Sequence, residues 1–272
     1  MAGYGISIYT ADCGDFLFSI LLYNTVMLSD LFFTLLYQPL YNGLLFLVST
    51  IPYADFGVAV VVLTVLVKVI LFPLTHKSVT TQAAMRKIEP HVRELRETYK
   101  DDKQKQSQKI MDLYREHGVN PFAGCLPFLI QIPVVIALYF VFLKGLTDGL
   151  QGEHIYSFIT VPEHISTMFL GLVDISGKSL LLALAAGVSQ YFQVKLATPP
   201  LPEKTPTSEP SFKQDFAKSF QLQMRYGLPV LVFFISYSIS GVIALYWFVS
   251  NLFTIGHELT VRRMARRVVA QD

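Results

Sequence analysis

A run of about twenty apolar residues with a lysine inside it constrains this chain more than any other feature. Residues 58–77 read VAVVVLTVLVKVILFPLTHK, and Lys68 is the only charge before Lys77. About 20 apolar residues cross a hydrocarbon core of about 30 Å, so we expect residues 56–74 to span a membrane. A charge inside a span costs roughly 2.5–3.5 kcal/mol on insertion scales. Lys68 is therefore expected to face water, a partner or a protein-lined cavity.

The composition is that of a protein with several membrane spans. The chain of 272 residues is 52% hydrophobic and 15% charged, whereas soluble domains carry about 25% charged residues. Two cysteines make no disulfide framework, and the sequence holds no zinc-ligand or phosphate-loop motif. We therefore predict no enzyme activity, catalytic residue, metal or cofactor.

The N-terminal part allows two interpretations. Residues 1–27 form an extension with no positively charged start and no small-residue cleavage site, so they do not read as a signal peptide. Residues 16–36 are long enough to form an extra span, whereas residues 28–52 can form an amphipathic helix lying in the membrane interface, and the second is favoured. Pro39 is expected to break or bend this helix.

Residues 75–120 are charged and predicted to be cytoplasmic. They hold ten lysines and arginines against seven acidic residues, and cytoplasmic segments carry an excess of Lys and Arg. Apolar residues recur at three- and four-residue steps from Met85 to Tyr99, as on one face of a helix. Residues 82–117 are therefore predicted to form a helical hairpin, in which Pro90 interrupts the first helix or starts its second half. The alternative is a solvated charged linker.

Four further spans are expected at residues 122–145, 179–195, 226–239 and 242–258. The flanks of residues 227–257 are both basic, which requires an even number of crossings, so a turn is placed at Ser240-Gly241. Residues 197–211 are Pro-rich and polar and read as a disordered loop. Residues 259–272 form a basic tail that sets topology and binds anionic lipid.

Several segments resemble the YidC/Oxa/Alb family of membrane protein insertases. They are LYQPLYNGLLFLVSTIP (36–52), VVVLTVLVKVILFPLTHKS (60–78), NPFAGCLPFLIQIP (120–133) and ALYWFVSNLFTI (244–255). The run at 120–133 is very specific, and the likeness covers residues from about 31 to 267. The Pro-rich loop and residues 1–26 lie outside the family pattern, and the large periplasmic domain of some members is absent.

The resemblance implies an all-α membrane protein with five core helices around a hydrophilic groove, a helical hairpin at the groove mouth and an N-terminal amphipathic helix. Family members usually place an arginine in the groove where this chain has Lys68, which keeps the charge but lacks a bidentate fork. By match of motif, Gln190 and Trp247 also face the groove, and Tyr246 and Asn251 lie close to it. In the hairpin, Arg86, Arg93 and Arg96 are the residues expected to contact partners.

The implied function is to insert and help fold proteins in the bacterial inner membrane, alone or with the Sec translocon. Nascent membrane proteins and anionic lipids are the expected partners, with the ribosome as a further one, and DNA is not. Simpler readings exist for each residue: Lys68 can extend its stem to the interface, Trp247 and Tyr246 can be interface aromatics, and Gln190 can bridge helices. A small-solute transporter or a structural membrane scaffold is the alternative function.

Overall fold

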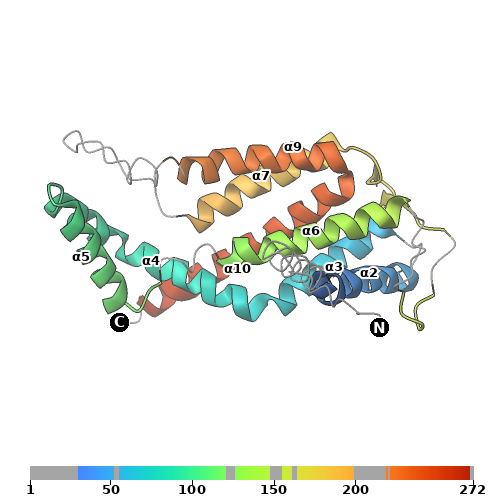
Figure 1. Cartoon of the computed structure of the whole chain (residues 1–272). Helices are drawn as coiled ribbons and strands as arrows, with labels where there is room; N and C mark the ends of the chain where they lie inside the picture. Colours follow the sequence, from blue (N-terminus) through green and yellow to red (C-terminus); the bar gives the residue numbers. More distant parts are fainter. Residues whose placement is uncertain are drawn as a thin grey trace, which may run out of the picture.

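The computed structural model describes residues 30–51, 55–120, 126–147, 155–160, 164–198, 219 and 221–269. The expected extension 1–27 and most of the expected loop 197–211 lie outside these residues. The described part is mostly helical and forms an elongated bundle, with α7 and α9 lying over α10, α6 and α3 (Figure 1). The C-terminal end of α10 lies beside α4, at the end of the molecule that carries α5.

The helices and strands follow one another along the chain. In order they are η1 (Phe33–Tyr37, a π-helical turn), α2 (Gln38–Thr50), α3 (Phe56–Ile70), α4 (Phe72–Thr98), α5 (Lys103–Glu116), α6 (Leu126–Thr147), β1 (Met168–Phe169), β2 (Val173–Asp174), α7 (Leu180–Ala197), η4 (Gln223–Gly227, a second π-helical turn), α9 (Leu228–Ile239) and α10 (Gly241–Val269).

Three described helices are long and apolar enough to cross a membrane: Asp30–Thr50, Leu180–Ala197 and Gly241–Met264. The pair α3 and α4 is a fourth if it counts as one bent span. The N-terminal helix, which we favoured as interfacial, thus also has the length and apolarity of a span. α9 has 12 residues, or about 18 Å of helix, and the chain turns at Ser240 before α10 begins.

The first expected span, 56–74, is not one straight helix. α3 ends at Ile70, and α4 leaves it at an angle of 68°. Pro73 explains the break: it lies in the first turn of α4, lacks an N–H, and its ring would clash with the carbonyl of Val69 in a continuous helix. The bend places Lys68 in the last turn of α3.

Other prolines are accommodated within helices. Pro39 does not break the N-terminal helix, because the π-helical turn η1 ends two residues before it and widens the hydrogen-bond ladder there. The π-helical turn η4 likewise ends two residues before Pro229. Pro90 lies inside α4, which continues from Phe72 to Thr98, so the interruption expected at Pro90 is wrong.

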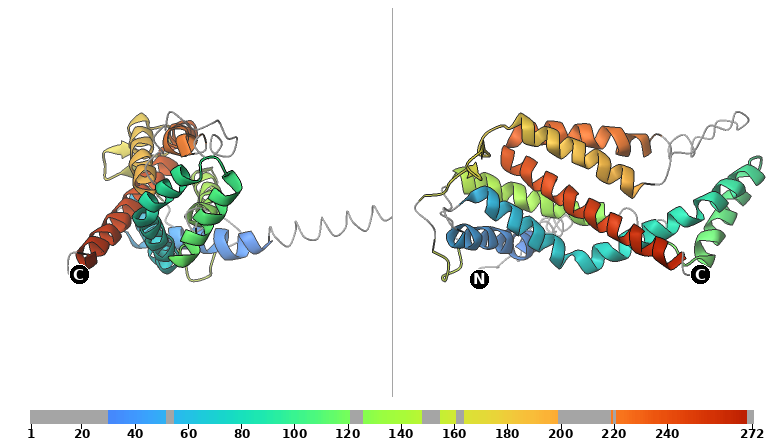
Figure 2. Two further views of the ribbon diagram at one scale, coloured as in Figure 1. Left: turned by 90° about the vertical axis from the view of Figure 1, so that its left-hand side faces the viewer. Right: turned by 180° about the vertical axis from the view of Figure 1, so that it is seen from behind.

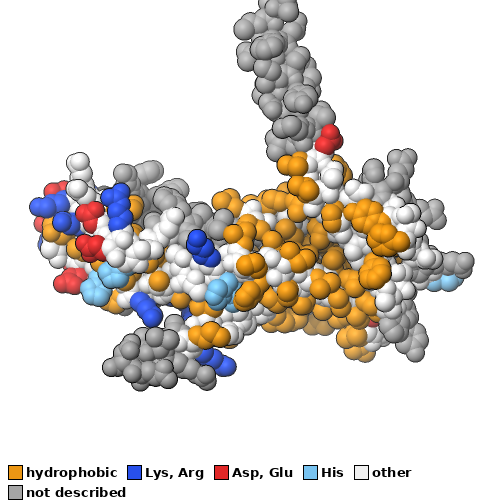
Figure 3. Space-filling view, turned by 90° about the horizontal axis from the view of Figure 1, so that it is seen from below, with side chains coloured by type: hydrophobic (Ala, Val, Ile, Leu, Met, Phe, Trp, Pro, Cys, Tyr) orange, Lys and Arg blue, Asp and Glu red, His pale blue; other side chains and the backbone are white. Residues whose placement is uncertain are grey.

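The charged segments are also helical. After α4 the chain turns at residues 99–102, where the Asp102 side chain caps α5 by accepting from the Lys105 N–H. α10 runs on to Val269, so the described part of the basic tail continues the preceding helix. Lys, Arg, Asp and Glu gather at the end that carries α4 and α5, and apolar side chains predominate over the middle of the face seen in Figure 3.

The main hydrophobic core is formed by α2, α3, α6 and the start of α10. It joins Leu44 and Leu45 of α2, Phe56 of α3, Phe142 of α6 and residues 242–246 of α10. Along α3 the side chains from Phe56 to Thr64 are mostly buried, whereas Val65, Leu66, Val69 and Ile70 are exposed. The close packing around α3 therefore ends shortly before Lys68.

Candidate functional site

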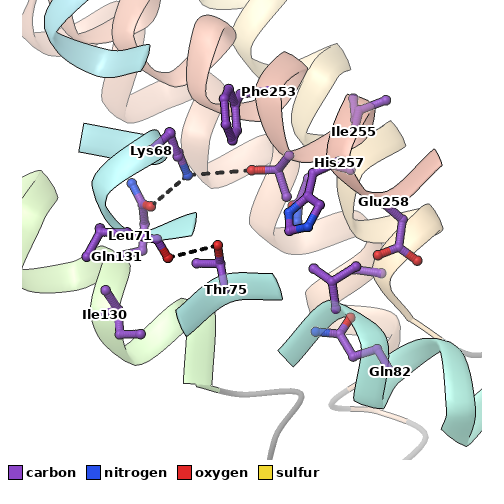
Figure 4. Close-up of a pocket in the computed structure, with 14 residues that line it drawn as sticks. Lys68, Leu71, Thr75, Gln82, Ile130, Gln131, Phe253, Ile255, His257 and Glu258 are labelled. Atoms are coloured by element: carbon purple, nitrogen blue, oxygen red, sulfur yellow. Dashed lines mark hydrogen bonds between the residues drawn. The ribbon is translucent and has the colours of Figure 1, made fainter. Parts of the chain in front are cut away.

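A pocket opens where the close packing ends, between α3, α4, α6, α7 and α10. Its volume of about 60 Å³ has room for water but not for a helix about 10 Å wide. Its lining is mixed: six of the fourteen residues are apolar, and the eight polar ones are Lys68, Thr75, Gln82, Gln131, Gln193, Thr254, His257 and Glu258. Figure 4 shows Lys68 of α3 and Gln131 of α6 pointing toward one another across it.

Lys68 is held by neutral groups. Its Nζ donates to Gln131 Oε1 at 3.2 Å and lies 3.5 Å from Thr254 Oγ1. Gln131 Nε2 in turn donates to the Tyr246 hydroxyl, which is buried. No carboxylate in the described part of the chain forms an ion pair with Lys68. The Lys68 ammonium is therefore hydrogen-bonded by neutral groups, and Glu258, the carboxylate that also lines the pocket, is paired with Arg86 and Arg262 instead.

A histidine pair closes the side of the pocket toward α4. His76 Nδ1 of α4 and His257 Nε2 of α10 lie 3.0 Å apart, so one carries the proton that the other accepts. The Phe72 ring lies 4.5 Å from the His257 ring and 5.4 Å from the His76 ring. No sequence pattern predicts this contact, because the two histidines are 181 residues apart and share no motif.

A charged cluster, which we call the clasp, lies next to the pair and consists of Arg86, Glu258 and Arg262. The Glu258 carboxylate is 3% exposed and lies 3.5 Å from Arg86 and 3.0 Å from Arg262. Arg86 also donates to the Thr198 carbonyl at 3.2 Å, and Arg262 donates to the Leu196 carbonyl. The clasp therefore ties α4 and α10 to the end of α7.

The other residues expected in the groove lie around the pocket rather than in it. Gln190 is buried in α7 and donates to Gln193, which lines the pocket, at 3.1 Å. Asn251 joins α10 to α7 through Ser189 Oγ at 3.1 Å. Trp247 is half-buried against the hydrophobic core. Of the five residues, only Lys68 lines the pocket, and Tyr246 reaches it through Gln131.

The three hairpin arginines have different surroundings. Arg86 belongs to the clasp. Arg93 forms an ion pair with Glu89 on its own helix at 3.6 Å. The backbone carbonyl of Arg96 accepts from the Gln106 side chain of α5 at 2.7 Å, which helps to hold the two helices together.

Comparison with known proteins identifies a family and relatives that this chain resembles. The model of the family described as 60Kd inner membrane protein matches residues 46–268. A protein of Pelobacter propionicus is 34% identical over 245 residues, which are 88% of this chain and 39% of the relative. One of Francisella tularensis subsp. novicida is 33% identical over 211 residues, or 77% of this chain and 33% of the relative.

Both relatives are named membrane protein insertase YidC, which agrees with the resemblance found in the sequence. This chain spans about a third to two fifths of their length. The apolar helices and the family together indicate a multi-pass inner membrane protein. Since the family model covers most of the sequence, the chain belongs to the family of the 60Kd inner membrane protein.

Proposed function

We propose that this protein inserts hydrophobic segments of nascent membrane proteins into the inner membrane, with Lys68 as the cation that attracts their acidic flanks. The observation that carries the proposal is Lys68 itself, which lies in a water-sized pocket and whose Nζ is held by Gln131 and Thr254 without a carboxylate in ion-pair contact. A lysine needed only for packing or folding would be expected to meet a counter-charge.

The mechanism follows from the cost of moving polar groups across lipid. A charged or unpaired polar group that crosses the hydrocarbon core costs several kcal/mol. A water-accessible pocket that reaches Lys68 shortens the distance that such a group must travel through hydrocarbon. We propose that this pocket is the floor of a groove that widens as substrate enters. The substrate's apolar segment then leaves toward lipid, driven by removal of its own surface from water.

The proposed orientation places α4, α5 and the end of α10 in the cytoplasm. These elements carry most of the lysines and arginines, as the positive-inside rule requires of cytoplasmic segments. The end of the molecule that carries α5 would then meet nascent chains, the ribosome or the Sec translocon, and its basic residues would meet anionic lipid. Names of the two relatives support insertion as the activity.

Insertion by Lys68 variants tests the proposal. Lys68→Arg keeps the charge, and Lys68→Ala removes it. Each variant replaces the cell's own insertase during depletion, and each is reconstituted into liposomes with a single-span test protein that has an acidic tail. We expect Lys68→Arg to insert the test protein and Lys68→Ala to fail. Full insertion by Lys68→Ala would contradict the proposal, and solute flux without insertion would favour a transporter.

A further inference from the structure

The segment between α6 and α7 forms a small β-hairpin that is fixed firmly at its base. Phe56 N–H donates to the Ser166 carbonyl at 3.0 Å, and Val242 N–H donates to the Ile175 carbonyl at 3.1 Å. Ile175 is fully buried. Phe169 packs so closely on Gly57 that a Cβ there would lie 2.5 Å from its ring. The base of the hairpin is therefore part of the core formed by α3 and α10.

The turn of the hairpin, by contrast, presents apolar side chains to the outside. Leu172 and Leu170 are 80% and 62% exposed, and Leu172 has the largest exposed fraction of any large hydrophobic side chain in the described part of the chain. Met168, at the start of β1, is 42% exposed. The neighbouring Phe169 and Val173 are partly buried against the core, whereas these leucines are exposed. Their exposure thus comes from the rigid geometry of the turn.

The backbone of the turn is unusual for a leucine. Leu170 and Gly171 have φ angles of 52° and 70°, and the Leu172 N–H donates to the Phe169 carbonyl at 3.0 Å. Two successive positive φ angles are typical of a tight hairpin turn in which Asn-Gly is preferred. Leu170 takes the place of the polar residue and is held in this strained conformation by a hydrogen bond from its N–H to Asp55 Oδ2 at 2.9 Å.

The turn lies at the level where the apolar surface of the bundle begins. The helix α7 starts at Leu180, and its exposed side chains are apolar from the first turn as far as Phe192: Leu180, Leu181, Leu184, Val188 and Phe192. The Lys178 ammonium lies over the Tyr237 ring, an arrangement typical of the membrane–water boundary. Figure 2 shows the strands at the end of the bundle opposite α5, projecting sideways beside α7.

The carboxylates near the turn are hydrogen-bonded within the protein. Asp174 Oδ1 accepts from both the Ser176 N–H at 2.9 Å and the Ser176 hydroxyl at 2.7 Å. Asp55 is engaged by the N–H groups of Val58 and Leu170. Both carboxylates therefore have partners within the protein, and the tip itself carries only apolar side chains.

We propose that the Leu170–Leu172 turn inserts into the lipid interface at the end of the bundle opposite α5 and anchors the protein at that depth. Its partner is the boundary between the headgroups and the acyl chains. A rigid base, an apolar tip and continuity with the apolar face of α7 fit lipid, which is already present beside α7. This inference depends on the chain being in a membrane and does not depend on insertase activity.

A depth measurement on the full chain tests the inference. Single cysteines replace Leu172, Leu170, Leu184 and Asp101 in a background with Cys13→Ser and Cys125→Ser, and each carries a bimane label. Leu184 lies on the apolar face of α7 and Asp101 in the α4–α5 turn, so they report hydrocarbon and water. The variants are reconstituted into vesicles of phosphatidylethanolamine and phosphatidylglycerol, and unchanged thermal unfolding shows that each is folded.

We expect labels at Leu172 and Leu170 to show blue-shifted emission relative to Asp101. They should also be quenched by a lipid nitroxide placed near the headgroup, and only weakly by aqueous iodide. Emission and iodide quenching equal to those at Asp101 would overturn the inference. Protection from iodide without quenching by lipid nitroxides would also overturn it, because the turn would then be covered by protein.

Discussion

Replacing Gln131 with glutamate should abolish the attraction of Lys68 for acidic substrates while leaving the fold intact. Gln131 and glutamate have the same shape, and Gln131 Oε1 already lies 3.2 Å from the Lys68 ammonium. In the variant a carboxylate oxygen takes that position. In the variant, Lys68 forms an ion pair with the new carboxylate. In the parent protein its ammonium is hydrogen-bonded by neutral groups.

The expected size of the effect follows from the distances. Two unit charges 3.2 Å apart attract by about 5 kcal/mol at an effective dielectric constant of about 20. The desolvation of the new carboxylate offsets most of this, so we expect the free energy of unfolding to change by roughly 2 kcal/mol or less. An acidic substrate residue about 4 Å from an unpaired Lys68 gains about 4 kcal/mol under the same conditions. The pair removes most of that gain, and since about 1.4 kcal/mol is tenfold, insertion should slow at least tenfold.

Insertion into liposomes of two matched single-span proteins measures the effect. One protein has an acidic tail, and in the other the acidic residues are replaced by their amides. We expect Gln131→Glu to slow insertion of the first protein much more than insertion of the second. Gln131→Met is the control, because it removes the hydrogen bonds but leaves Lys68 charged. It should lower stability by about 1.5–3 kcal/mol and retain the preference for the acidic tail.

Equal insertion rates for the parent and a folded Gln131→Glu variant on the acidic-tailed protein would refute this reasoning. The Lys68 charge would then serve the structure of the pocket and not the recognition of substrate. A loss of insertion of both test proteins to the same degree would point in the same direction, since the effect would not depend on the substrate's charge.

Two further predictions concern the clasp and the hairpin. Glu258→Gln removes the counter-charge of Arg86 and Arg262, whose side chains are 18% and 27% exposed, and should lower the free energy of unfolding by about 1–3 kcal/mol in a thermal melt. A restored melting temperature in Arg86→Met/Glu258→Met would show that the unpaired charge was the cause. The Ser176 hydrogen bonds lower the pKa of Asp174, so its contribution to stability is present above the unfolded-state pKa and disappears as the pH falls through the lowered one. Ser176→Ala should raise the pKa of Asp174 toward its ordinary value in an NMR titration, and an unchanged pKa would contradict this cause.

The sequence draws attention to Lys68, which lies in the candidate pocket, but not to the residues that contact it. Lys68 is visible because a charge within an apolar run is costly wherever it faces lipid. Gln131 stands out only as a polar residue inside another apolar segment, and its contact with Lys68 joins residues 63 positions apart. The histidine pair and the clasp depend on the crossing of α4 and α10. A single sequence gives no signal for such a crossing.

Helix boundaries were predictable where a side chain or a turn residue fixes them. The break at Ser240-Gly241 and the start of α5 after Asp102 lie where the sequence indicates. The effects of the prolines were less predictable, because each depends on whether the helix around it can change its hydrogen bonding. Pro90 is tolerated inside α4, whereas Pro73 begins a new helix. The short β-hairpin was missed, since its two strands have only two residues each.

The bend at Pro73 connects the fold to the proposed chemistry. Because α4 turns away by 68° after Leu71, the last turn of α3 lacks a helical continuation that would cover Lys68 along the same axis. The pocket there is lined by polar and apolar side chains of the surrounding helices, and the charged part of α4 begins beyond it with Lys77. Water that hydrates this charged part is therefore expected close to the pocket. A straight helix through Leu71 would carry the apolar surface past Lys68 and separate the lysine from water, so we infer that the break in the helix, more than the lysine alone, makes a charge tolerable at this depth.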